Sequence, residues 1–388
     1  MTEQVVVLGS GYAGAGAVRS LESSLSGDAE ITWVSDVDYH LVLHETHRCI
    51  SDPSVEEKVK IPVEEIKSES TAFRQATVAG VDTDERTVRI DDGEDIDYDY
   101  LLVGVGTRTA FFGIEGLQKH AHTLKGLDDA LGIHDDIVDA AAEATQTEPA
   151  QVVIGGAGLS GIQTAGEVAE LRDERSLPID IHLVEGLDEI FPNNDASIQA
   201  ALRSLLEARD VNILTGEFIG EVDDETVYIG EDTELDYDVL VWTGGITGRE
   251  AVREANVDKD ERNYRLQAGQ NFQTSDERVF AIGDAALIDQ DDDDPAPPTA
   301  QAAWQAAEVV GENIAREIRG QPLKEWTYKN KGTVVSVGED AVAHNIFVVP
   351  FVDTFGGFPA RTLKKAIATR WIKDVTGVGR AVNAWSDM

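Results

Sequence analysis

The sequence predicts an α/β fold with two parallel sheets, each carrying a glycine-rich turn between a strand and a helix. Two stretches support this prediction, VVVLGSGYAGAGAVRSL at residues 5–21 and VVIGGAGLSGIQTAGEVAEL at residues 152–171. In each, a short apolar run meets three glycines, and an alanine-rich helical pattern follows. A third observation is that the next strand of each unit ends at a carboxylate, Asp36 in the first and Glu185 in the second.

The three glycines of the first stretch, Gly9, Gly11 and Gly14, have the spacing of a dinucleotide-binding turn. The first allows a tight turn, the second allows close approach of a pyrophosphate, and the third lets the helix pack on the strand. The helix N-terminus then faces the phosphates. Asp36 is placed to accept hydrogen bonds from a ribose.

The second stretch repeats the pattern with Gly156, Gly158 and Gly161. One such pattern is a weak signal, because glycine-rich turns are common. Two copies, each with its strand, helix and terminal carboxylate, predict two Rossmann-like dinucleotide-binding domains. Glu185 would accept a hydrogen bond from a ribose 2′-hydroxyl and repel a 2′-phosphate, and no arginine follows it, so NADH is favoured over NADPH.

Two further stretches indicate which cofactor each glycine unit binds. VFAIGD ends at Gly283 and Asp284, and it resembles the second flavin motif of flavoproteins with two dinucleotide-binding domains, in which the aspartate holds the ribityl chain. YLLVGVGT ends at Gly106 and Thr107, and it resembles the motif at which the chain leaves their flavin domain. Both flank the second glycine unit. The resemblance therefore implies FAD at the first unit and NADH at the second, in a domain inserted within the FAD domain.

The chain resembles the type II NADH dehydrogenases, which are single-subunit NADH:quinone oxidoreductases, over nearly its whole length. The resemblance rests on DVDYHLVLHE, DYDYLLVGVGTRTAFFGIEG, VWTGGI, VFAIGDAA and AQAAWQ, the last of which matches the family's quinone-site pattern AQxxxQ. It implies a glutathione-reductase-like fold. The expected parts are an FAD-binding domain at 1–112 and 249–325, an NADH-binding domain at 113–248 and a C-terminal segment at 326–388. It also implies cofactor contacts by Val78, Gly244 and Ala300.

The resemblance implies a reaction in which hydride passes from NADH to the flavin N5 and electrons then pass to a membrane quinone, without proton pumping. Gln301 and Gln305 lie four residues apart, on one helical face among small alanines, and each amide could donate to a quinone carbonyl. A solvated helix face is the alternative. Lys331 is expected near the flavin and the quinone, with a surface lysine as the alternative.

Gln163 marks a departure from the family, which commonly has a glutamate at this place near the nicotinamide. Glutamine keeps hydrogen bonding but cannot take a proton. A mechanism that gives this position a proton-transfer role is therefore in question for this chain, although Gln163 remains a candidate catalytic residue.

Acidic side chains dominate the composition, with 73 Asp and Glu against 32 Lys and Arg and a net charge of −41. In molar salt the Debye length shrinks to about 3 Å, which screens the resulting self-repulsion. We therefore expect a salt-adapted protein. The excess of acids also argues against a general affinity for nucleic acid, because little would neutralise phosphates.

The C-terminal stretch has the opposite charge balance, since residues 355–388 contain six Lys or Arg and two acids. Leu363, Ile367 and Trp371 are spaced four apart, which predicts an amphipathic helix at a membrane surface. Docking on the protein's own acidic surface, or on a second subunit of a homodimer, is the alternative. Without a signal segment or a membrane-spanning run, we expect a cytoplasmic protein, peripheral on the inner face of the cell membrane.

Other classes of protein remain open. A sulfide:quinone oxidoreductase needs a pair of redox cysteines, and this chain has only Cys49. A soluble reductase of a small iron–sulfur carrier would not need AQAAWQ or the basic tail. A redox-sensing flavoprotein, with Gln163 marking lost catalysis, is a third possibility. His40, His44 and His47 lie in or beside the flavin-domain match, so no metal is expected.

Overall fold

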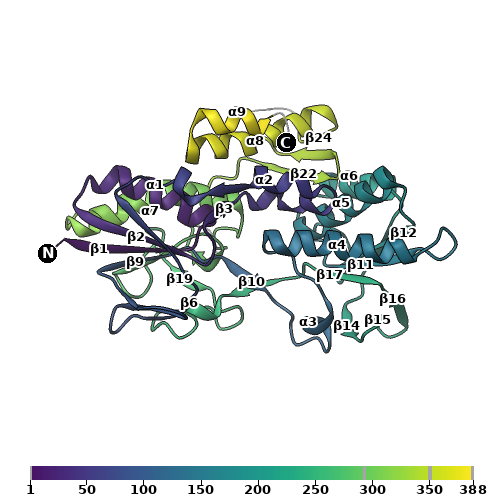
Figure 1. Ribbon diagram of the computed structural model, residues 1–388, viewed down its shortest axis with the longest axis horizontal. Coiled ribbons are helices and arrows are strands. Elements are labelled where there is room, and N and C mark those ends of the chain that lie inside the picture. Colours follow the sequence, from purple (N-terminus) through teal and green to yellow (C-terminus); the bar gives the residue numbers. More distant parts are fainter. Residues whose placement is uncertain (1, 292–293, 348–351, 386–388) are drawn as a thin grey trace.

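Two parallel sheets form the centres of the two halves of the molecule in a computed structural model that describes residues 2–291, 294–347 and 352–385 (Figure 1). The strand orders are β20-β9-β1-β2-β5 and β13-β12-β11-β17. In both, the strand before the glycine turn lies inside the sheet, so the turn opens at the carboxyl edge. The strands are β1 (Glu3–Leu8), β2 (Ala29–Ser35), β5 (Thr71–Gln75), β9 (Tyr100–Val103), β20 (Val279–Ala281), β11 (Ala150–Gly155), β12 (Ile179–Glu185), β13 (Val211–Thr215) and β17 (Val239–Trp242).

Small residues bring helices α1 and α7 unusually close beside the first sheet. A Cβ on Gly16 would lie 2.7 Å from the Cβ of Ala307, and one on Gly311 would lie 2.6 Å from the backbone nitrogen of Leu21. The alanine-rich patterns of the sequence thus serve close helix packing. The α-helices are α1 (Tyr12–Leu25), α2 (Glu56–Val59), α3 (Leu117–His120), α4 (Leu127–Glu143), α5 (Leu159–Arg175), α6 (Ala196–Glu207), α7 (Ala300–Ile318), α8 (Phe358–Thr376) and α9 (Val378–Trp385).

The chain passes between the two halves along one pair of strands. β10 (Thr107–Thr109) leaves the first half and pairs antiparallel with β18 (Ile246–Gly248), which returns to it. Every strand of the second parallel sheet lies between these two in the sequence. The second sheet is therefore built from one continuous stretch of chain.

Short antiparallel sheets and 3₁₀ helices complete both halves. One β-meander follows β5, and another precedes β17. The remaining strands are β3 (Tyr39–Leu41), β4 (Lys60–Pro62), β6 (Val78–Asp82), β7 (Thr87–Ile90), β8 (Ile96–Asp97), β14 (Ile219–Val222), β15 (Thr226–Ile229), β16 (Thr233–Asp236), β19 (Leu266–Ala268) and β21 (Ala286–Ile288), and the 3₁₀ helices are η1 (Leu43–Ile50), η2 (Pro53–Val55), η3 (Val63–Glu65), η4 (Glu250–Val252) and η5 (Gly283–Ala285).

The C-terminal part lies across both halves, as Figure 1 shows in yellow and light green. It consists of an antiparallel sheet, β22 (Thr333–Val337), β23 (Asp340–His344) and β24 (Thr354–Gly356), followed by α8 and α9. In the described part of the chain, no helix is both long and apolar enough to cross a membrane.

The prediction that Leu363, Ile367 and Trp371 form one membrane-facing stripe was wrong. Trp371 is only 1% exposed, and its indole nitrogen donates to Nε2 of His40 at 2.8 Å. Its ring also packs against Tyr12 and Trp304. Spacing of four places side chains on one helical face, but here that face turns in part toward the protein's own core.

Candidate functional site

A cavity of about 330 Å³ lies at the carboxyl edge of the first sheet. A cavity of this size lies within the range of small-molecule sites. Nine of the ten residues predicted to contact FAD line it: Gly9, Gly11, Asp36, Val78, Gly106, Thr107, Gly283, Asp284 and Ala300. The tenth, Gly14, lies beneath the turn.

The three glycines of the first turn have three different environments. Gly9 has a φ of +95°, which favours glycine. A Cβ on Gly14 would lie 1.8 Å from the carbonyl oxygen of Gly9, so this glycine permits packing of helix on strand. Apart from Gly11 itself and the chain immediately around it, no atom of the described residues lies within 4 Å of where a Cβ on Gly11 would be. Packing within the protein therefore does not require a glycine at position 11. Close approach of a ligand to the N-terminus of α1 would require one.

The second turn repeats this division. Gly156 has a φ of +90°, a Cβ on Gly161 would lie 1.8 Å from the carbonyl oxygen of Gly156, and a Cβ on Gly158 would enter open space. The backbone of Gly244 lies against the turn, since its Cα is 3.0 Å from where a Cβ on Gly156 would be. Both turns thus have the shape that a dinucleotide diphosphate requires.

Glu185, the last residue of β12, lies against the second glycine turn. It is 9% exposed, and its carboxylate accepts hydrogen bonds from the backbone nitrogens of Ala157 at 2.8 Å and Leu187 at 3.1 Å. These bonds hold the carboxylate beside the glycine turn, at the end of β12. A ribose that follows the turn would meet a fixed negative charge there.

Two basic side chains that the sequence analysis did not single out also line the cavity. Lys125 and Arg249 line it together with Asp284. Burial lowers the pKa of Lys125, while Asp284 opposes this, and burial raises the pKa of Asp284 against Lys125 and Arg265. An anionic ligand in the cavity would raise the pKa of Lys125 again and so favour its charged form. No motif surrounds Lys125, so only the fold could place it here.

The two glutamines of α7 hold a neighbouring segment. The amide of Gln301 donates to the carbonyl of Gly332 at 3.1 Å and accepts from the backbone nitrogen of Lys331 at 2.8 Å. Gln305 donates to the carbonyl of Lys329 at 3.0 Å and accepts from its nitrogen at 3.2 Å. The glutamines therefore fix residues 329–332 against the start of α7.

Lys331 is exposed and is not among the residues that line the cavity. The structure does place its backbone beside Gln301, at the N-terminal end of α7. Ala300, the first residue of this helix, borders the cavity. The predicted quinone residues thus lie beside the predicted flavin site, although Lys331 presents its side chain to solvent.

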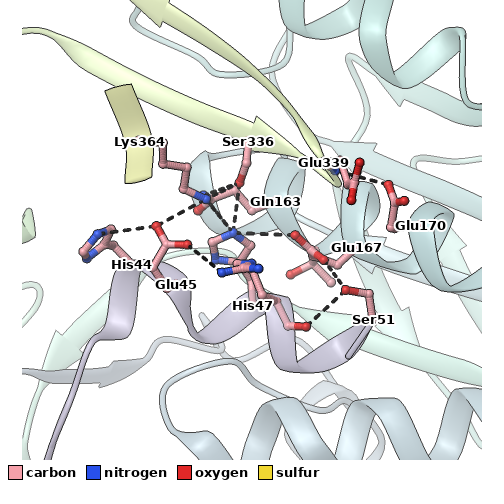
Figure 2. A network of polar contacts seen from close by, with 12 residues as sticks. His44, Glu45, His47, Ser51, Gln163, Glu167, Glu170, Ser336, Glu339 and Lys364 are labelled. Atoms are coloured by element: carbon pink, nitrogen blue, oxygen red, sulfur yellow. Dashed lines mark hydrogen bonds and ion pairs between the residues drawn. The ribbon is translucent and has the colours of Figure 1, made fainter. Parts of the chain in front are cut away.

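Gln163 belongs to a buried polar cluster at the junction of both halves and the C-terminal part (Figure 2). Its amide nitrogen lies 3.1 Å from Oγ of Ser336 and 3.3 Å from Nε2 of His47. The same His47 nitrogen lies 3.0 Å from Nζ of Lys364 and 3.8 Å from a carboxylate oxygen of Glu167. Nothing in the local sequence of 47 or 364 predicts this meeting, because the two are 317 positions apart.

The single cysteine has no redox environment. Cys49 is fully buried, and burial raises its pKa to about 12. A thiol of this kind is not a nucleophile near neutral pH, because the thiolate is the reactive form. Among the described residues, no three His, Cys, Asp or Glu side chains form a group suited to a metal ion.

The model of the pyridine nucleotide-disulphide oxidoreductase family matches residues 3–307, a stretch that contains both glycine turns, so the chain belongs to this class of protein. A type II NADH:quinone oxidoreductase of Staphylococcus aureus is 30% identical over an alignment that covers 98% of this chain and 97% of that protein. The chain therefore belongs to the type II NADH:quinone oxidoreductase family.

Solved structures agree on the fold. NDH2 of Plasmodium falciparum, in complex with NADH, superposes with a TM-score of 0.86 at 17% identity, over 100% of this chain and 97% of that one. The sulfide:quinone oxidoreductase of Aquifex aeolicus gives a TM-score of 0.80 at 20% identity, over 97% and 92%. At these identities the likeness establishes the architecture alone.

Proposed function

We propose that the protein is an FAD-dependent NADH:quinone oxidoreductase. The observation that carries this proposal is the pair of glycine turns with open space at Gly11 and Gly158, in a chain that matches a type II enzyme over its full length. When bound, FAD would supply a ring that takes a hydride from NADH and returns two electrons to a quinone.

The chain's own residues would position the two dinucleotides. The N-terminus of α1 and Lys125 would bind the FAD diphosphate. Asp36 and Asp284, which follow β2 and β20 on the two sides of β1, would bind hydroxyls. Glu185 would select NADH by accepting from its 2′-hydroxyl. In this proposal residues 1–112 and 249–325 form the FAD domain, and residues 113–248 form the NADH domain.

Quinone would approach from the side of α7, and the C-terminal part would bring the protein to the inner face of the cell membrane. Among the described residues, seven of the thirteen exposed large apolar side chains lie between 347 and 385. Three of them, Val378, Val382 and Trp385, follow helical spacing on α9. An apolar helix face of this kind inserts into a membrane surface, and a homodimer through the same face is the alternative that the experiment below separates.

The test begins with the purified protein, which should be yellow and contain one non-covalent FAD. Anaerobic NADH should bleach the flavin, and a quinone should restore its colour. Sedimentation with liposomes should remove the protein from solution, whereas a dimer would stay soluble at twice the monomer mass. A folded but colourless protein that takes up no FAD would refute the proposed function.

A further inference from the structure

One tryptophan of the C-terminal part is linked to the first glycine turn through a buried histidine. The indole nitrogen of Trp371 donates to Nε2 of His40 at 2.8 Å. The other ring nitrogen of His40, Nδ1, lies 2.7 Å from the backbone carbonyl oxygen of Ser10, which stands between Gly9 and Gly11. Trp371 and His40 are 1% and 0% exposed, so water does not compete for these bonds. Two hydrogen bonds in series thus join helix α8 to the turn.

The two neighbours of His40 fix its protonation. An indole nitrogen only donates, so Nε2 of His40 must accept and carries no proton. A carbonyl oxygen only accepts, so Nδ1 must carry the proton. Both requirements describe the same neutral tautomer. Burial lowers the pKa of His40 to about 4, which keeps the ring neutral near pH 7. The histidine is therefore a fixed link between Trp371 and Ser10.

The bond to Ser10 also orients the next N–H group of the turn. Ser10 and Gly11 share one peptide group, and the described chain has no cis peptide bond. In a trans peptide the carbonyl and the N–H point in opposite directions. Because His40 holds the carbonyl of Ser10, the N–H of Gly11 points away from His40. Gly11 borders the cavity, and no described residue accepts from this N–H. It is therefore available to a diphosphate at the N-terminus of α1.

The same tryptophan packs against the residue that follows the turn. Tyr12 is the first residue of α1 and lines the cavity. Its ring centroid lies 4.5 Å from that of Trp371, with an angle of 34° between the planes. It also meets the ring of His40 edge-on at 5.2 Å. Trp371 thus holds this part of the chain at two places, at the carbonyl of Ser10 through His40 and at Tyr12 directly.

We propose that Trp371 and His40 are positioning residues for FAD, through which retention of the cofactor depends on the docking of helix α8. The inference rests on the proposed function, because it takes FAD as the ligand of the cavity. Without the indole N–H, His40 loses the partner that fixes its tautomer, and the carbonyl of Ser10 is held less firmly. The N–H of Gly11 is then no longer pre-aligned. FAD binds more weakly, because ordering the turn costs free energy at the moment of binding.

The coupling acts in both directions, since a change in affinity at one site requires an equal change at the other. FAD that orders the first glycine turn therefore also stabilises the docking of α8. The effect extends to α9, because Gly377 alone separates the two helices. The exposed apolar face of α9 is thus fully positioned only in the FAD-loaded protein, so an enzyme without cofactor presents a less ordered surface to the membrane.

The first test measures FAD affinity in the full-length protein. FAD is removed and then titrated back, and flavin fluorescence reports binding. Trp371→Phe removes the indole N–H and keeps an aromatic ring, and it should raise the Kd for FAD about tenfold or more. Trp304→Phe is the matched control. It alters a ring that packs on Trp371 at 4.9 Å, leaves both hydrogen bonds of His40 in place, and should bind FAD as tightly as wild type.

Amide hydrogen exchange tests the reverse direction. In the wild type, saturating FAD should slow exchange over α8 more than over α6, which lies in the second half. In Trp371→Phe saturated with FAD, this additional protection of α8 should be lost. Should Trp371→Phe fail to fold, exchange in the wild type decides alone.

The possible failures are distinguishable. An unchanged Kd in Trp371→Phe, an equal loss of affinity in Trp304→Phe, or wild-type α8 that FAD protects no more than α6 overturns the coupling only. Wild-type protein that folds but takes up no FAD overturns the proposed function, and the coupling with it.

Discussion

Glu185 is the residue on which we expect the nucleotide preference to depend. Replacement by serine should reduce the preference for NADH over NADPH by about tenfold or more, because the charge that repels a 2′-phosphate is lost. The ratio of kcat/KM values for the two nucleotides measures this. Glu185→Gln keeps an oxygen for the backbone nitrogen of Ala157 and removes only the charge. A wild-type preference for NADPH would contradict the role given to Glu185.

Gln163 provides the second prediction at this scale. A glutamate there would place a carboxylate beside His47 and Ser336, within the group that also holds Lys364. We expect flavin reduction by NADH to acquire a new pH dependence in Gln163→Glu, since a titrating group is added, while FAD content stays unchanged. Stopped-flow absorbance across pH measures this. Gln163→Met serves as the control. If flavin reduction has the same pH dependence in both variants, position 163 does not lie near the nicotinamide.

The residues that could be predicted from sequence are those whose chemistry is local. Each glycine turn and its strand-end carboxylate fall within about thirty residues, as the fingerprint requires. The polar cluster could not be predicted, because His47, Gln163 and Lys364 come from three separate elements that only the tertiary fold joins. Lys125 was missed for the same reason. Lys125 becomes a candidate ligand-binding residue only because the fold places it in the cavity beside Asp284, and no residue next to it in the sequence indicates this.

At the scale of elements, α7 supports the segment that follows it, and this changes what its glutamines predict. Gln301 makes hydrogen bonds to Gly332, Lys331 and Tyr328, whereas Gln305 makes both of its bonds to Lys329. Gln301→Leu should therefore lower the free energy of unfolding more than Gln305→Leu, each by about 1–3 kcal/mol. Denaturant unfolding measures this. Equal or negligible losses would show that the segment is held by other contacts.

The quinone role of the same helix remains a prediction with its own measurement. If the two amides also line the quinone site, either leucine variant should raise the KM for quinone about tenfold to a hundredfold. Single-turnover flavin reduction by NADH should barely change, because the amides do not face the second glycine turn. Equal damage to both half-reactions would assign the glutamines to structural support alone.

The prediction of membrane contact now rests on helix α9, because Trp371 of α8 is buried in the protein. Val378→Asp with Val382→Asp should weaken sedimentation with liposomes at least severalfold, since both side chains are apolar and are 63% and 65% exposed. Folding should be little affected, as exposed positions rarely contribute much stability. Phe218→Asp, an equally exposed apolar side chain in the second half, is the control. Unchanged sedimentation would refute the contact. The failed stripe on α8 shows that apolar spacing alone does not distinguish a membrane from a neighbouring helix.

For the whole molecule, the charge of −41 predicts how stability depends on salt. Screening shortens the Debye length from about 10 Å at 0.1 M to about 3 Å at 1 M, which reduces repulsion among the carboxylates of the folded state. The melting temperature should therefore rise between these concentrations of sodium chloride, as calorimetry would show. Potassium chloride at equal strength should act alike. A flat or falling melting temperature would refute the salt adaptation.

The position of β20 in the first sheet has a consequence for the order of folding during synthesis. That sheet requires residues 279–281 to pair with β9, and α1 requires α7, which ends at Ile318. The second sheet needs nothing beyond Trp242. Domains usually fold from the N-terminus as the ribosome proceeds. Here the second half can fold first. The strands β1, β2, β5 and β9 can pair with one another, but the free edge of β9 and the face of α1 remain uncovered until β20 and α7 have emerged.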